Sequence, residues 1–171
     1  LSDGRLITTW ESNGQDGSSE GIYGQIHDSN GTPTGSEFQI NTYTNSHQKF
    51  PDVTALPDGG FVVAWASSGQ DGSNEGVYGQ RYDTAGVAVG DEFRINTYTS
   101  RYQQDASMTT LDNGSLVVTW ESGYHWSTQD GSGYGIYGKV FDADGLVAGP
   151  EFQVHTSTSG DQHDPSVTAL D

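Results

Sequence analysis

The chain has 171 residues, no cysteine, and a formal net charge of −17, from 23 acidic side chains against 6 lysines and arginines. Such a surface repels nucleic acids and anionic membranes and attracts cations, which excludes nucleic-acid binding as a role. A disulfide framework and a thiolate metal site are also excluded. Because no apolar stretch approaches the roughly 20 residues of a membrane helix, we expect no membrane insertion.

Four strand-like runs follow one another in the first 56 residues. Arg5–Trp10 begins after an Asp-Gly turn, and Gly21–Ile26 follows an acidic, glycine-rich loop. Glu37–Asn41 alternates apolar with polar side chains, and Asp52–Leu56 follows a proline. Aspartate and glycine supply the turn chemistry between the runs. Since no segment shows helical periodicity with a capping signal, the sequence predicts an all-β chain.

The four runs then recur in the same order. Trp10, Trp65 and Trp120 are spaced by 55 residues, and the third copy carries four extra residues within Gly123–Thr128. A period of this size is typical of repeat architectures. We predict one repeat array over 1–171, with repeats at 1–55, 56–110 and 111–169, and with 170–171 starting the next repeat.

The run Phe61–Trp65 distinguishes between architectures. Its residues are apolar on both faces of an extended strand. A strand buried on both faces lies inside stacked sheets rather than in the wall of a one-sided barrel. The sequence therefore predicts β-propeller-type blades, three repeats of four antiparallel strands. A β-trefoil, which also has three repeats of four strands, is the alternative.

Three blades do not close a ring, since propellers typically have at least about four. We therefore expect either a homodimer that completes a six-bladed ring or a place in a longer array. The boundaries of the repeats leave the first strand of the first repeat free to meet the fourth strand of the last.

The acidic loop "GQDGSSEG" returns nearly unchanged in the second repeat and altered in the third. Calcium prefers six to eight oxygen ligands, which such loops provide. The candidate ligands are Asp16 with Glu20 and Asp71 with Glu75, whereas a tyrosine leaves Asp130 alone in the third copy. The competing interpretation is a turn in which the aspartate caps its own backbone. Both interpretations stay open at this point.

The insertion in the third repeat contains the one aromatic cluster that the repeat does not explain, Tyr124, His125 and Trp126. Exposed aromatic side chains on a loop are typical of carbohydrate or partner contacts. The loop could equally fold back over the edge of a blade.

Catalytic patterns are weak. The five histidines show no H-x-x-x-H spacing, and no G-x-S-x-G motif occurs. A glycosidase needs only two suitably placed carboxylates. However, the acidic residues mostly recur with the repeat, as structural residues do, so the sequence predicts that the chain is not an enzyme.

Three motifs carry a resemblance that covers essentially the whole chain: W-x-S-x-G-Q-D-G-S-x-x-G-(I/V)-Y-G-Q, D-x-x-G-x-x-x-G-x-E-F-x-(I/V)-N-T and P-x-V-T-A-L-x-D-G-G-F-V-V-x-W. They resemble tandem repeats of giant secreted bacterial adhesins and surface proteins of the RTX type (haemolysin-type calcium-binding). The resemblance implies an extracellular, calcium-rich setting and an adhesive or scaffolding parent protein. The nonapeptide G-G-x-G-x-D of RTX β-rolls is absent, so its calcium sites do not carry over.

Together these observations predict a non-catalytic, calcium-associated binding or structural module of an extracellular bacterial adhesin. Glycans or other cell-surface components are the expected partners. A lectin-like, carbohydrate-binding propeller module is the alternative. A glycoside-active enzyme would need a unique pair of acidic residues, which the repeat pattern does not display.

Overall fold

The computed structural model of the protein describes residues 1–124, 129–143 and 147–170. These ranges contain strands and turns but no helix, so the prediction of an all-β chain is confirmed. A membrane-spanning helix is accordingly absent from the same ranges. The strands are β1 (Leu6–Asn13), β2 (Glu20–His27), β3 (Phe38–Gln39), β4 (Gln48–Ala55), β5 (Phe61–Ser68), β6 (Glu75–Tyr82), β7 (Ala88–Arg94), β8 (Tyr102–Thr110), β9 (Leu116–Gly123), β10 (Tyr134–Phe141) and β11 (Phe152–Gln153).

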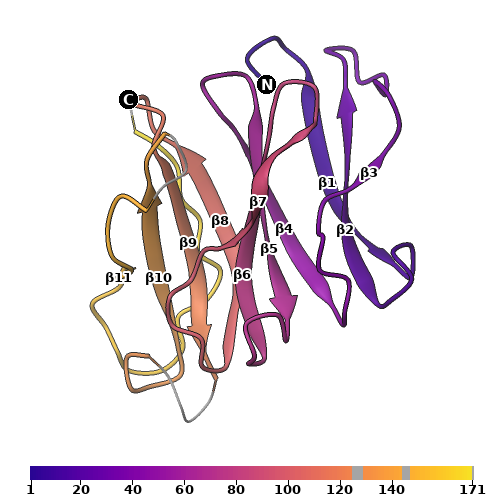
Figure 1. Cartoon of the computed structure of the whole chain (residues 1–171). Helices are drawn as coiled ribbons and strands as arrows, with labels where there is room; N and C mark the ends of the chain where they lie inside the picture. The colour runs from indigo at the N-terminus through magenta and orange to yellow at the C-terminus, as the bar shows by residue number, and fades with distance from the viewer. Residues whose placement is uncertain (125–128, 144–146, 171) are drawn as a thin grey trace.

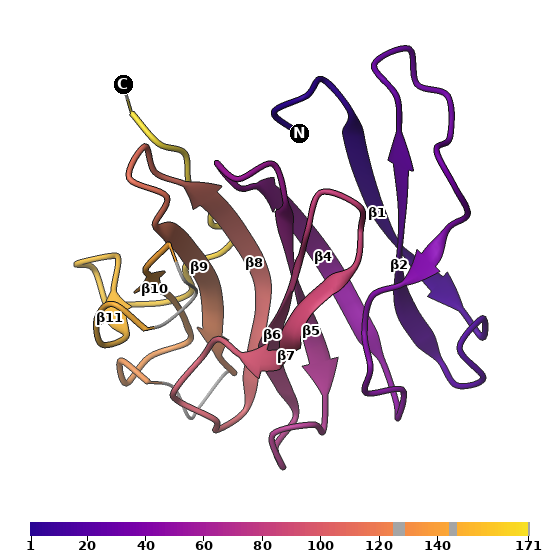
Figure 2. The same ribbon diagram turned by 45° about the horizontal axis from the view of Figure 1, so that its top comes forward.

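The strands form a row of three twisted sheets, which we call blades 1, 2 and 3 (Figures 1 and 2). Blade 1 has the order β1-β2-β3, blade 2 the order β4-β5-β6-β7, and blade 3 the order β8-β9-β10-β11. Pairing within each blade is antiparallel, and a single parallel pair, Glu75 with Tyr102, joins blade 2 to blade 3. This arrangement is propeller-type.

The inner strand of each blade comes from the end of the preceding repeat. β4 pairs with β5, and β8 pairs with β9, so a blade crosses the boundary between two repeats. β4 lies beside β8, where Asp52 Oδ2 accepts a hydrogen bond of 2.6 Å from the Met108 amide. The third inner segment, 162–170, lies along blade 3. We call β4, β8 and residues 162–170 the inner strands, although residues 162–170 follow the path of a strand without forming a ladder.

The extent of two predicted strands differs from expectation. β4 begins at Gln48, four residues before the predicted start, and continues through Pro51. A bulge between Lys49 and Asp52, with Phe50 at φ 56°, accommodates the proline, because bulges need no amide donor at the displaced residue. The predicted strand 37–41 shortens to two residues, because only Phe38 and Gln39 pair with β2.

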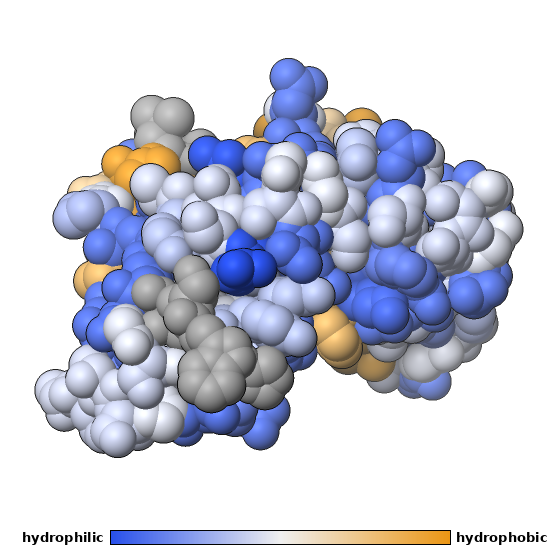
Figure 3. Space-filling model, turned by 90° about the horizontal axis from the view of Figure 1, so that it is seen from below, coloured by the Kyte–Doolittle hydropathy of each residue, from blue (hydrophilic) through white to orange (hydrophobic). Residues whose placement is uncertain are grey.

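The hydrophobic core lies between the blades. Trp65 and Trp120 are completely buried, and they belong to two separate clusters. Phe61 and Tyr82 stack within one cluster with their ring centroids 5.0 Å apart. A β-trefoil would instead enclose its core within a barrel, so that alternative does not fit. The surface seen from below is mostly hydrophilic, with small separated hydrophobic areas (Figure 3).

The motif Gly-(Ile/Val)-Tyr-Gly owes its second glycine to close packing between neighbouring strands. A Cβ added at Gly79 would lie 3.0 Å from the Phe93 ring, and one at Gly138 would lie 2.8 Å from the Phe152 ring. Glycine lets the outer strand's aromatic ring lie directly on the backbone.

Candidate active site

The QDGS loops have the geometry of turns. Asp16 Oδ1 accepts a hydrogen bond of 3.0 Å from the Ser18 amide, and Asp71 Oδ1 accepts one of 2.9 Å from the Ser73 amide. The other oxygen of Asp16 is buried and lies 2.7 Å from where a Cβ on Gly21 would stand. Gly21 is therefore required in β2, because any larger side chain would collide with the carboxylate of Asp16.

The predicted partners of these aspartates have contacts of their own. Glu20 accepts a hydrogen bond of 3.3 Å from the side-chain amide of Asn13, and it also forms a hydrogen bond with His47. Glu75 accepts a hydrogen bond of 3.3 Å from the Ser68 hydroxyl, and burial raises the pKa of its carboxyl. In the third repeat, Asp130 lies 3.5 Å from His155 Nε2. Within residues 1–124, 129–143 and 147–170, no three His, Asp or Glu side chains gather as a metal site, and calcium stays a prediction.

The aromatic insertion is described only in part. Tyr124 is 41% exposed, and its ring lies 5.3 Å from the ring of Tyr102. His125 and Trp126 fall outside the described residues. A role of this loop in ligand contact stays a prediction.

The inner strands bring together a different set of acidic side chains. A hollow of about 320 Å³ lies where β4, β8 and residues 162–170 run side by side. Its volume is at the lower end of the range for small-molecule sites. Three aspartates, one from each inner strand, line it together with Pro51 and Pro165: Asp52, Asp105 and Asp164.

Two of these aspartates lie at positive φ, and one of them, Asp105, lies in a bulge. Asp105 has φ 51° and Asp164 has φ 54°, in the left-handed region that aspartate adopts more readily than most residues. The register of β8 with β9 shifts between Gln104 and Ser107, on either side of Asp105. A bulge of this kind redirects a side chain out of the ladder, here into the hollow.

The environment of the hollow raises the pKa of two of its carboxyls. Burial raises the pKa of Asp105, and the negative charges of Glu121 and Asp164 raise it further. Burial also raises the pKa of Asp52, against the lowering effect of the hydrogen bond from the Met108 amide. Desolvation disfavours the charged form of a carboxyl, and a like charge nearby adds to that effect.

A buried glutamate holds the third aspartate in place. Glu121, only 2% exposed, accepts a hydrogen bond of 2.7 Å from the Asp164 amide through Oε1. Its Oε2 lies 3.1 Å from His163 Nδ1, and this bond raises the pKa of His163. Glu121 therefore fixes the backbone of the inner segment 162–170 against β9 without itself reaching the hollow.

Sequence reasoning missed this set because it treated the acidic residues as parts of the repeat. Asp52 stands where the other repeats have Ser107 and Ser166, and Asp105 stands where the first repeat has Phe50. The available signal was this departure from the repeat in the segment around the inner-strand proline.

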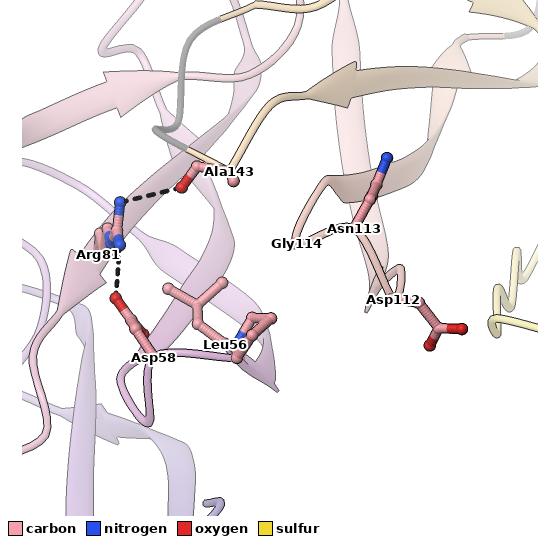
Figure 4. Close-up of a pocket in the computed structure, with 8 residues that line it drawn as sticks. Leu56, Asp58, Arg81, Asp112, Asn113, Gly114 and Ala143 are labelled. Carbon is pink, nitrogen blue, oxygen red and sulfur yellow. Dashed lines mark hydrogen bonds and ion pairs between the residues drawn. The ribbon is translucent and has the colours of Figure 1, made fainter.

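A second hollow of about 220 Å³ lies between blades 2 and 3 (Figure 4). Arg81 crosses it, with hydrogen bonds of 2.7 Å to Asp58 and 3.4 Å to the carbonyl of Ala143. The Gly60 amide and Arg81 together lower the pKa of Asp58. Because the guanidinium already has these partners, we assign this hollow to the packing of the blades.

Comparison with known proteins gives no matching family model and no matching curated protein. Solved structures do match. The α-L-arabinanase of Penicillium chrysogenum, in complex with arabinobiose, has a TM-score of 0.66 at 17% identity, over 90% of this chain and 46% of its own. The endo-arabinase of Bacteroides thetaiotaomicron has a TM-score of 0.55 at 18% identity, over 89% and 57%. The chain thus spans about half the length of each, and the likeness supports a propeller-type fold.

These matches correct three sequence predictions. The predicted non-catalytic adhesin module, its lectin-like alternative and the conclusion that the chain is not an enzyme are contradicted, because the two matched structures named above are arabinanases, which are enzymes. The physical reason is that a propeller-type fold gathers inner-strand residues from successive repeats into one hollow. Acidic residues that are isolated in the sequence thereby become neighbours.

Proposed function

We propose that the chain forms part of a glycan-degrading propeller and that the hollow between its inner strands hydrolyses glycosidic bonds. The observation that carries this proposal is the set of three aspartates from three inner strands, two of them with raised pKa, in one hollow. The arabinanase fold of the matched structures supports the same reaction class.

Glycoside hydrolysis requires an acid that protonates the leaving oxygen and a second carboxylate on the other side of the scissile bond. Asp105 suits the first role, since burial and the negative charges of Glu121 and Asp164 raise its pKa, the direction that a general acid requires. Asp164 suits the second role, because it is exposed in the same hollow and its backbone is held by Glu121. The proton of Asp105 passes to the oxygen of the departing sugar as the glycosidic bond breaks. Water adds its hydroxyl to the anomeric carbon of the other sugar and gives its remaining proton to Asp164, and proton exchange with solvent restores both carboxyls.

The charge of the chain limits the class of glycan. A net charge of −17 repels polysaccharides that carry carboxylates, so the substrate is a neutral polymer. Arabinan, on which the matched enzymes' names are based, is neutral and is therefore the first polymer to test. Polygalacturonate is the matched acidic polymer.

The test is the release of reducing ends from arabinan and from polygalacturonate. We expect release from the neutral polymer and a loss of at least about 100-fold in Asp105→Asn, since a positioned general acid contributes about 10²–10⁴-fold. Asp91→Asn is the matched control, because Asp91 is an exposed acid on the outermost strand of blade 2. Full activity in Asp105→Asn, or no release from any neutral glycan, would contradict the proposal.

A further inference from the structure

Phe50 of β4 has a backbone conformation that suits its side chain poorly. The same position of the repeat holds Asp105 in β8 and Asp164 in the inner segment 162–170, and the three residues have φ of 56°, 51° and 54°. Aspartate adopts this left-handed region more readily than most residues, whereas a bulky residue there is a genuine outlier. Phenylalanine is therefore the strained choice at a position where the other two repeats have aspartate.

Packing in the core does not account for this strained residue. Phe50 is 42% exposed, and it belongs to neither of the two hydrophobic clusters that the described residues form. Three residues further along β4, Val53 does pack against one of them. Strained backbone of this kind gathers at ligand sites, where the surrounding structure holds it in place. The strain at Phe50 therefore points to a ligand.

A glutamate of the neighbouring blade holds the backbone of Phe50. Glu11 Oε1 of β1 accepts a hydrogen bond of 2.7 Å from the Phe50 amide. Glu121 Oε1 makes the same contact, also at 2.7 Å, with the Asp164 amide. Phe50 is thus fixed in the way that one aspartate of the hollow is fixed. A side chain on a fixed backbone is preorganised for binding.

The hollow between the inner strands offers this ring a ligand of defined character. Phe50 lines it together with Pro51, Ala106, Pro165 and the three aspartates. An apolar wall with a few placed polar groups is typical of small-molecule sites. A sugar matches such a wall, because its ring has C–H groups on its faces and hydroxyls around its edge. The negative face of an aromatic ring attracts the C–H groups, and the carboxyls accept from the hydroxyls.

We propose that Phe50 is a stacking platform for one sugar residue of a neutral glycan and that it holds the glycan beside Asp105. This inference rests on the proposed function of the hollow and adds the residue that binds the substrate. β4 and β8 lie side by side, so the platform and the proton donor stand on neighbouring strands. The ring has no positive charge to pair with a sugar carboxylate, which agrees with a neutral polymer.

Three substitutions at Phe50 separate stacking from packing. Phe50→Tyr keeps the ring, Phe50→Leu keeps apolar bulk without a flat face, and Phe50→Asn removes both but tolerates the positive φ. Phe152→Leu is the matched control, because Phe152 is also 42% exposed and lies on β11, at the far edge of blade 3 from β8. Each substitution is combined with Asp105→Asn, and calorimetry measures the binding of arabinan oligosaccharides.

We expect Phe50→Leu and Phe50→Asn to weaken binding about 3–10-fold, the effect of losing contact with an aromatic face. Phe50→Tyr and Phe152→Leu are expected to bind like the Asp105→Asn parent. Phe50→Asn is also expected to melt at or above the parent's temperature, because it relieves the strained φ. Unchanged binding in Phe50→Leu overturns the platform. A lower melting temperature of Phe50→Asn overturns it as well, since the ring would then support the fold.

Kinetics on arabinan separate this inference from the proposed function. With Asp105 intact, Phe50→Leu is expected to raise KM by the same factor and to leave kcat nearly unchanged, as for a group that only binds. Hydrolysis by the parent chain with an unchanged KM in Phe50→Leu overturns the platform and leaves the proposed function standing. If the parent chain hydrolyses no neutral glycan but Phe50→Leu still weakens binding, the proposed function is overturned and the platform is supported.

Discussion

Blades 1 and 2 are built from nearly the same sequence motifs and yet differ in burial. Seven consecutive residues of β5, Phe61–Ser67, are buried, whereas no residue of β1 reaches that class. Both strands follow a turn with a glycine at positive φ, and both carry a tryptophan at the same position. Among the described residues, blade 2 has β4 on its inner edge and a blade on each side, while β1 of blade 1 pairs with β2 alone and has one neighbouring blade. The sequence repeat is therefore not the packing unit.

The largest expected effect comes from removing the tryptophan of each blade. Trp65→Ala leaves a cavity in a completely buried position and is expected to cost about 3–5 kcal/mol of unfolding free energy. Trp10→Ala acts on a partly exposed side chain and is expected to cost less than half of that. Urea unfolding of both variants at low protein concentration measures the difference. Equal losses would show that blade 1 is packed as tightly as blade 2.

The repeat also shows which parts of the fold were accessible from sequence. Most of the strands and the Asp-Gly turn before the first strand follow from patterns within ten residues and were predicted, whereas the fourth run of the third repeat, residues 162–170, is not assigned as a strand. The bulge that carries β4 through Pro51 was not predicted. Proline is tolerated within a strand only at a sheet edge or a bulge, and only the pairing of β4 with β5 alone shows that both conditions hold here.

The candidate site was missed for a related reason. Asp52, Asp105 and Asp164 lie more than 50 residues apart in the chain, and each resembles a turn residue in its local sequence. Their approach depends on the inner strands lying side by side, which no local pattern encodes. By contrast, the acidic loops with Asp16 and Asp71 were predicted as candidate calcium sites because they repeat. In the structure these aspartates have turn geometry.

A smaller effect on stability is expected at Asp105 of β8, the position at which β4 has Phe50. The pKa of Asp105 is raised above its ordinary value of 3.8, so the folded chain holds this proton more tightly than the unfolded chain. Stability therefore falls as pH rises from about 3.8 through the raised pKa. Asp105→Asn removes this loss of stability at higher pH, and asparagine tolerates the positive φ of residue 105.

This variant is expected to melt about 1–3 °C above the parent chain at pH 7 and to match it below the ordinary pKa. Thermal melts across the acid range measure the difference, with Asp91→Asn as the control for lost surface charge. A lower melting temperature for Asp105→Asn at pH 7 would show that the ionised carboxylate stabilises the hollow, against the interpretation given above.

The inner strands form the candidate site and complete blades 2 and 3. Hydrogen–deuterium exchange of β1 and β5 tests this role most directly, because β5 has β4 on its inner edge and β1 pairs with β2 alone among the described strands. We predict that β5 amides are protected and that β1 amides on the edge away from β2 exchange faster. Equal protection of the two strands would contradict the role of the inner strands.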